Sequence, residues 1–304
     1  MSFSSQDVVK LRQNTGAGMM DCKNALTEAN GDVEKASEIL RQRGLAQAAK
    51  KAEKTTFEGI VTSKISADNK SAVILELNSQ TDFVAKNDVF IALSKDLLDL
   101  ILSKKPASVD ALLDLDINGT KVSDKIASAV SQTGENIQVR RFQIFNLSSD
   151  GVLGTYIHPV GNKIGVLTLL SGKSSQSLQD LARDISMHIA ASQPQPEFID
   201  KSQIPQEIIE NEKRIELGKE DVSKKPKEIA EKIVQGRLDK VLSQRCLINQ
   251  PFIKDPNITI EKLIQEKSKE LGADIKIVNF IRYNVGESTD KSSDEEAKEA
   301  ASIK

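Results

Sequence analysis

The sequence predicts an α+β protein, with a small helical module followed by a two-part core of small antiparallel sheets packed with helices. Two periodicities carry this prediction. Apolar residues recur at helical spacing near the N-terminus and again between residues 205 and 242. Short β-branched runs bounded by polar residues, such as 72–77, indicate strands instead. In each half of the core, predicted hairpin strands precede a predicted helix.

Residues 1–54 form the first predicted unit, a three-helix module with its linker. A first helix is expected to end at Gly16, and a second to follow Gly18. A third helix is expected to begin after Asp32 and to stop at Gly44. The Ala- and Lys-rich chain beyond Gly44 predicts a helical or flexible linker.

The turn between the first two helices carries adjacent methionines, Met19 and Met20. Methionine side chains are flexible and polarizable, and they are common on surfaces that bind partners. The alternative is an ordinary turn between helices with both methionines in a core. Residue chemistry leaves these two interpretations open.

Residues 55–134 form the second predicted unit, the N-subdomain of the core. Two strands should pair as a hairpin, and three helices should follow. These elements are expected at 57–65, 71–77, 89–102, 109–115 and 122–130.

A polar corner joins the second strand of this unit to its first helix. Thr81 and Asp82 are candidate N-caps there. Phe83 is unusual, because aromatic residues make up only 4% of the chain. It is either a plug packed under the helix, which residue chemistry favours, or a wedge held out for a partner.

Residues 135–286 form the third predicted unit, the C-subdomain. Three strands at 137–147, 152–158 and 163–170 are expected to form a meander, followed by a helix at 177–191. Further on, a helix and a final strand that returns to the sheet are expected at 258–271 and 275–285.

Within this unit, residues 194–243 predict a helical hairpin. Its helices begin at Pro205 and Pro226, and a short loop makes them antiparallel. The hairpin either projects as an arm for assembly or folds onto its own domain. The polar, acidic tail at 287–304 is either frayed or ordered only by a partner.

The bulk composition excludes several classes of function. A formal net charge of -2 over 304 residues argues against broad binding to nucleic-acid phosphates. Two cysteines cannot form a disulfide framework or a four-thiolate zinc site. The two histidines, His158 and His188, lack metalloprotease spacing, the phosphate-loop motif is incomplete, and no nucleophile-elbow motif appears. We therefore expect no enzyme activity, no catalytic residues, no metal, no cofactor and no direct nucleotide binding.

Targeting patterns are also missing from the sequence. No apolar run has the length of a membrane span, and the N-terminus has no secretory or transit pattern. The sequence therefore predicts a cytoplasmic protein without a membrane interaction.

Two motifs carry a resemblance to a known family. Residues 11–26, LRQNTGAGMMDCKNAL, and residues 81–86, TDFVAK, closely resemble the elongation factor Ts family. Further matches extend the resemblance over nearly the whole chain. They lie at 134–137, His158, 164–167, 225–232, 250–252 and 280–282.

The resemblance implies a guanine-nucleotide exchange factor for the translational GTPase elongation factor Tu. Such a factor promotes release of GDP and magnesium from the GTPase and so allows GTP to reload during translation elongation. The N-terminal module would be ubiquitin-associated-like, and the hairpin would project from the core. The Asp82–Phe83 corner would enter between helices of the GTPase, which favours the wedge for Phe83.

The resemblance also implies which residues contact the GTPase. One group lies at the corner, a second on the N-terminal module, and a third at core positions near the interface. These residues are Thr81, Asp82, Phe83 and Val84; Arg12, Met19, Met20 and Lys23; and Gly134 and His158.

Three points stay open at this level. Docking of the C-terminal tail on the GTPase is the least secure part of the resemblance. A homodimer through the helical hairpin occurs in some members of the family, and these residues do not decide it. An adaptor or chaperone that binds helices through Met19 and Met20 is the alternative function.

Overall fold

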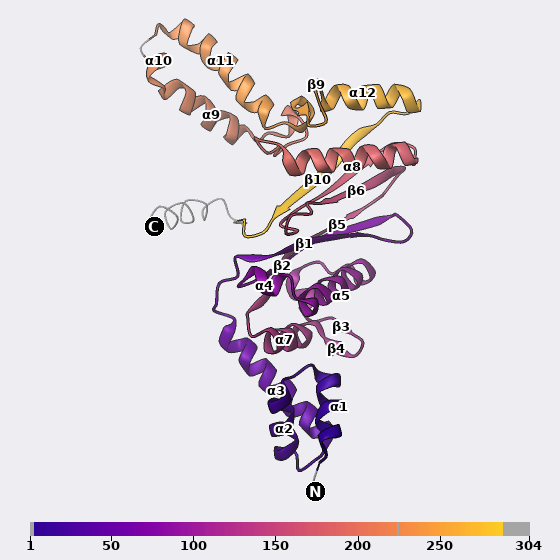
Figure 1. Cartoon of the computed structure of the whole chain (residues 1–304). Helices are drawn as coiled ribbons and strands as arrows, with labels where there is room; N and C mark the ends of the chain where they lie inside the picture. The colour runs from indigo at the N-terminus through magenta and orange to yellow at the C-terminus, as the bar shows by residue number, and fades with distance from the viewer. Residues whose placement is uncertain (1–2, 224, 288–304) are drawn as a thin grey trace.

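The computed structural model describes residues 3–223 and 225–287, and it has the predicted α+β class. Two three-stranded antiparallel sheets lie face to face, and helices cover both outer sides of the pair. The N-terminal helical module lies at one end of this stack and the helical hairpin at the other (Figure 1). The candidate site residues are distributed along one long molecule.

The N-terminal module consists of α1 (Ser5–Thr15), α2 (Met19–Glu28) and α3 (Val33–Lys51). Gly16 ends α1 in the left-handed conformation with φ 69°, as the sequence predicts. Asp32 caps α3 through hydrogen bonds from two backbone N–H groups. Leu11, Cys22 and Leu26 are buried in a small core of their own.

The predicted stop of the third helix at Gly44 is wrong, because α3 continues to Lys51. Gly44 is buried where α3 crosses α7 (Val122–Thr133). A Cβ atom at this position would lie 3.8 Å from the Ala127 carbonyl oxygen and the Ser131 side chain. These are ordinary van der Waals distances, so the crossing has room for a Cβ atom here, and most of the linker is helical.

The first sheet has the order β1 (Glu58–Ile65), β2 (Ser71–Ser79), β5 (Ile137–Asn146). The predicted hairpin of β1 and β2 is confirmed. The predicted meander of three consecutive strands in the C-subdomain is wrong, because β5 pairs with β2. The apolar residues Ile137 and Val139 of β5 belong to the core under the helices of the N-subdomain.

Those helices cover the outer face of the first sheet. They are α4 (Asp82–Ala85), α5 (Asp88–Lys104), α6 (Val109–Leu113) and α7, with a small ribbon of β3 (Asp116–Ile117) and β4 (Thr120–Lys121). Phe90 and Leu97 of α5 are fully buried in this core. Asn87 caps α5, while Thr81 caps the separate single turn α4, so the corner contains a helix of its own.

The second sheet has the order β10 (Lys276–Asn284), β7 (Ile164–Ser171), β6 (Gly151–Ile157). The return of the final strand to this sheet is confirmed. The helices α8 (Gln176–Ala191) and α12 (Ile260–Leu271) cover its outer face. The division of the core at 134/135 stays a prediction, although β5, which follows this point in the chain, belongs to the first sheet.

The two sheets pack together through a shared apolar layer. Val61 and Ile74 from the first sheet contact Leu153 and Leu167 from the second. Every residue of β2 is buried, including Glu76, because the second sheet covers one face of the strand and the N-subdomain helices cover the other. The Glu76 carboxylate accepts a 2.6 Å hydrogen bond from Arg141 of β5.

The predicted helical hairpin is present and projects from the C-terminal half (Figure 1). It consists of α9 (Gln206–Gly218), α10 (Glu220–Ser223) and α11 (Lys227–Gln244). At its base, Arg245 pairs with Glu197 at 2.6 Å and with Glu212 at 3.0 Å.

Short elements complete the chain around the hairpin. They are η1 (Lys201–Gln203), η2 (Leu247–Asn249), β8 (Pro251–Phe252) and β9 (Asp255–Thr259). The tail predicted at 287–304 lies outside the described residues except for Glu287.

Candidate functional site

The corner between β2 and α5 places Phe83 on the surface. Thr81 caps α4, since its hydroxyl accepts a hydrogen bond from the Val84 N–H at 3.4 Å. This single turn directs Val84 and Ala85 into the core, whereas Phe83 is 81% exposed. The plug interpretation of Phe83 is therefore wrong, and the side chain is free to contact another molecule.

A carboxylate accompanies the exposed ring. Asp82 forms an ion pair with Lys86 one turn later, at 2.6 Å. The hydrogen bond from Lys86 is the main cause that holds the pKa of Asp82 below its usual value. The corner therefore presents an anion beside an aromatic ring.

Glu135, which lies one residue beyond Gly134, holds the corner from the other side. Its carboxylate accepts hydrogen bonds from the Thr81 N–H at 2.9 Å and the Thr81 hydroxyl at 2.7 Å. Gly134 ends α7 in the left-handed conformation with φ 78°, and this turn brings Glu135 to the corner. Residue chemistry did not identify Glu135 as a site residue, and the family match at 134–137 is the signal that contained it.

A hollow of about 400 Å³ lies beside the corner. Gly59 of β1, Asp82 and Lys163 are among the residues that line it, so both halves of the core contribute to this surface. Two other large apolar side chains close to these residues in the sequence are exposed: Phe57, two residues before Gly59, and Val160, three residues before Lys163. Neither was predicted to belong to the site.

His158 and Gly134 occupy different places in the core. His158 follows β6, is half-buried, and has its Nδ1 atom 3.2 Å from the Tyr156 hydroxyl. Gly134 is exposed at the end of α7, and its carbonyl oxygen accepts a hydrogen bond from the Lys51 ammonium of α3.

The N-terminal candidates form a second, separate group. Arg12, Met19, Met20 and Lys23 are all exposed, with Met20 at 62%. The interpretation that buries both methionines in a core is therefore wrong. The length of α3 separates this group from the corner (Figure 1), so the structure does not bring the predicted residues into a single cluster.

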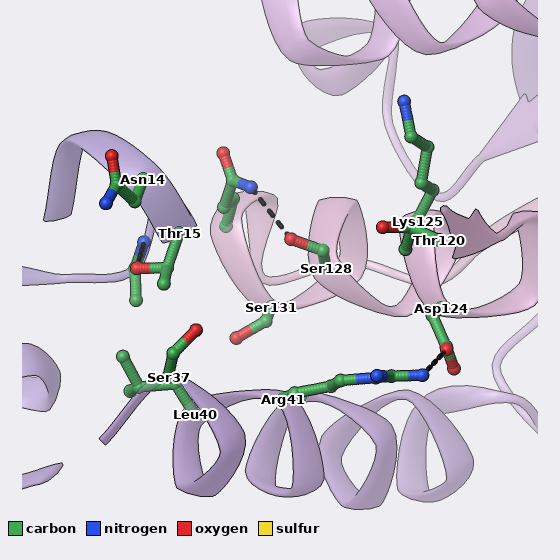
Figure 2. A pocket seen from close by; sticks show the side chains of 13 residues that line it. Asn14, Thr15, Ser37, Leu40, Arg41, Thr120, Asp124, Lys125, Ser128 and Ser131 are labelled. Carbon is green, nitrogen blue, oxygen red and sulfur yellow. Dashed lines mark hydrogen bonds and ion pairs between the residues drawn. The ribbon is translucent and has the colours of Figure 1, made fainter. Parts of the chain in front are cut away.

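A polar cavity of about 300 Å³ marks the seam between the N-terminal module and α7. Figure 2 shows Arg41 of α3 reaching Asp124 of α7, with which it forms an ion pair. Ser128 of α7 accepts a 3.1 Å hydrogen bond from Gln132 in the same cavity. This seam fixes the module to the N-subdomain. None of the predicted partner-binding residues is among those that line its cavity.

Few groups suited to bond-making chemistry come together in the described part of the chain. No cluster of three or more His, Cys, Asp or Glu residues gathers there that could hold a metal ion. Cys22 and Cys246 are buried, and burial raises the pKa of the Cys246 thiol. Buried His188 is satisfied by Gln250 at 3.1 Å.

Among residues 3–223 and 225–287, no helix is both long and apolar enough to cross a membrane.

Comparisons with known proteins identify the family. The family model described as Elongation factor TS matches residues 80–287. The chain is 42% identical to elongation factor Ts of Alkalilimnicola ehrlichii over 98% of this chain and 97% of that protein. It is 41% identical to elongation factor Ts of Nitratiruptor sp. over 99% of both chains. The relative from Nostoc sp. is 41% identical over 98% of this chain and 97% of its own. The chain therefore belongs to the elongation factor Ts family of translation elongation factors.

Proposed function

We propose that this chain is the guanine-nucleotide exchange factor of elongation factor Tu and that it acts in the cytoplasm. The observation that carries this proposal is the 81% exposed Phe83, which the corner holds away from its own core. It lies within the part of the chain that the family model matches. A solvent-exposed aromatic ring on an ordered turn is a ready anchor for a partner.

The proposed mechanism is thermodynamic linkage. A protein that binds the nucleotide-free GTPase more tightly than the GDP-bound form must weaken GDP binding by the same factor. Phe83 and Asp82 would enter between helices of the GTPase and disturb the side that holds magnesium. Burial of one Phe side chain supplies about 1.5–3 kcal/mol, which corresponds to roughly one to two decades of coupling.

The candidate residues outside the corner would provide affinity rather than coupling. Arg12, Met19, Met20 and Lys23 would dock the N-terminal module, while Gly134 and His158 would lie near the core contact. Thr81 and Val84 would support the corner, since one caps α4 and the other is buried beneath it. Excess GTP would then displace the factor. In this proposal the chain makes no covalent bond and holds no nucleotide.

Release of a fluorescent GDP analogue from elongation factor Tu tests this function. The chain should accelerate release in a saturable manner, and it should leave release from an unrelated GTPase unchanged. Equal rates with and without the chain would exclude the exchange function.

A variant of the N-terminal module separates exchange from the adaptor alternative. The double variant Met19→Ser/Met20→Ser changes two exposed side chains. An exchange factor should keep its maximal release rate and need a higher concentration to reach it. An adaptor that relies on this turn should lose nearly all binding to elongation factor Tu.

A further inference from the structure

The turn after α7 is bonded to the corner by a charged group. The Glu135 carboxylate accepts two hydrogen bonds from Thr81, one from its N–H and one from its hydroxyl. Hydrogen bonds to an ionised acceptor are about twice as strong as neutral ones. Thr81 in turn caps α4 at the Val84 N–H. Glu135 therefore acts on the helix that carries Phe83 without touching Phe83.

Asn136, the next residue of the same turn, forms hydrogen bonds on both of its sides. The Asn136 backbone N–H donates to the Gln80 side-chain oxygen at 3.0 Å, on the corner side. The Asn136 side-chain amide donates to the carbonyl oxygens of Lys54 at 2.8 Å and Ala52 at 3.3 Å, on the linker side. Asn136 is only 6% exposed, so this junction is a buried part of the fold.

The linker side of this junction leads to the N-terminal module. Ala52 directly follows α3, whose last residue Lys51 donates a hydrogen bond to the Gly134 carbonyl. The turn 134–136 thus contacts both the end of α3 and the start of α4. These are the elements that carry the two separate groups of candidate partner-binding residues.

The corner needs such support because α4 spans only four residues. A single helical turn has too few hydrogen bonds to be stable by itself. The exposed ring of Phe83 makes little packing of its own. Its direction is set by the Thr81 cap and by the burial of Val84, so a loosened cap would let the ring adopt several orientations.

We propose that Glu135 and Asn136 are positioning residues: Glu135 fixes the direction of Phe83, and Asn136 fixes the N-terminal module relative to the same corner. The proposal rests on the exchange function proposed above for its kinetic consequence. Its structural consequence can be measured on the free protein, without any partner.

Amide hydrogen exchange of the free full-length chain tests the structural part. The reporters are the Val84 and Ala85 amides, which bond to Thr81 and not to Glu135. Glu135→Ala removes two charged hydrogen bonds and should speed their exchange by at least about tenfold, the effect expected for the loss of one of them. Glu135→Gln keeps one acceptor oxygen, so its amide exchange rates should lie between those of wild type and Glu135→Ala. Glu53→Ala, an exposed carboxylate in the linker, is the matched control and should leave both amides unchanged.

The kinetics of GDP release from elongation factor Tu test the positioning roles of Glu135 and Asn136. Glu135→Ala should lower the maximal release rate about tenfold and leave the half-saturating concentration within about twofold, because docking surfaces remain. Asn136→Ala should mainly raise the half-saturating concentration, because the module is misplaced. In a Thr81→Val background, where the hydroxyl partner is gone, Glu135→Ala should have a smaller effect.

Two results would overturn the proposal. One is unchanged protection of Val84 and Ala85 in Glu135→Ala. The other is faster amide exchange in that variant with an unchanged maximal release rate, which would reduce Glu135 to a purely structural group. If wild-type protein fails to accelerate GDP release, the exchange function fails instead, and the amide measurement alone decides whether Glu135 holds the corner.

Discussion

At the scale of single residues, buried polar groups are the most informative features of this chain. Glu76 is fully buried between the two sheets, and Arg141 supplies its charge partner. The Arg141 guanidinium also lies 4.1 Å from the ring centroid of Tyr283 in the second sheet. Burial raises the pKa of Tyr283 to about 12, so its hydroxyl stays neutral there. The ion pair therefore joins β2 and β5, and the contact of Arg141 with the Tyr283 ring adds β10.

Removal of Arg141 should destabilise the protein strongly. Arg141→Ala leaves a buried carboxylate without its partner and should cost about 3–5 kcal/mol of unfolding free energy. Lys64→Ala breaks the exposed ion pair with Asp99 and should cost less than about 1 kcal/mol. Chemical denaturation of both variants measures the difference. Similar costs for the two variants would show that the buried pair does not stabilise the junction of the sheets.

His188 should make stability depend on pH. Its Nδ1 atom accepts a hydrogen bond from the Ile253 N–H at 3.2 Å, and burial is the main cause that lowers its pKa below 6.5. The unfolded chain therefore binds this proton at a higher pH than the folded chain. Stability from this group is present above pH 6.5 and is lost as the pH falls further.

The measurement compares unfolding free energies of wild type and His188→Asn between about pH 5 and 8. Below the pKa of this histidine in the unfolded chain, the unfolding free energy of wild type should fall with decreasing pH by up to about 1.4 kcal/mol per pH unit more than that of the variant. Parallel curves for the two proteins would contradict the lowered pKa of His188.

At the scale of secondary-structure elements, two glycines have opposite roles. A Cβ atom at Gly154 of β6 would lie 2.7 Å from atoms of Ala182 in α8, so this glycine lets the helix rest on the sheet. Gly236 lies inside α11, and a Cβ atom built there would have no neighbour within 4 Å outside its own helix. The same substitution should therefore change stability in opposite directions.

Gly154→Ala should destabilise the protein by about 1–3 kcal/mol, because α8 must move from the sheet. Gly236→Ala should stabilise it by about 0.5–1 kcal/mol, because alanine is the better helix former. Thermal unfolding of the two variants measures both effects. A Gly154→Ala protein as stable as wild type would show that α8 adjusts at no cost.

Most elements follow from local periodicity, whereas the pairing of β5 with β2 does not. The helices and hairpins are local, and the sequence patterns at 57–65, 177–191 and 258–271 predict them to within a few residues. The partner of β5 is set by contacts with β2, which is far away in the chain. The sequence pattern predicts instead that β5 pairs with the strands that follow it. Gly44 predicts a helix end because glycine is a poor helix former, whereas α3 continues through it and packs on α7, about 80 residues away.

At the scale of the whole molecule, the candidate site is spread along the stack. The N-terminal group and the corner lie at opposite ends of α3, and the hairpin projects beyond the second sheet (Figure 1). Residue chemistry located the corner but favoured a buried Phe83, because most apolar side chains pack inward. Resemblance to the family favoured exposure, and the structure agrees. Glu135 lies within the family match at 134–137, but neither line of reasoning assigned it a role, because its partner Thr81 is 54 residues away.

The most direct test of the account measures labelled GDP release from elongation factor Tu with wild type, Phe83→Ala and Ile229→Ala, with complex formation measured in parallel. Ile229 is an exposed apolar residue on the hairpin and serves as the control. The account predicts that Phe83→Ala lowers the maximal release rate by roughly one to two decades. Binding should be largely kept, and Ile229→Ala should behave as wild type. A Phe83→Ala protein that releases GDP as fast as wild type at saturation would contradict it.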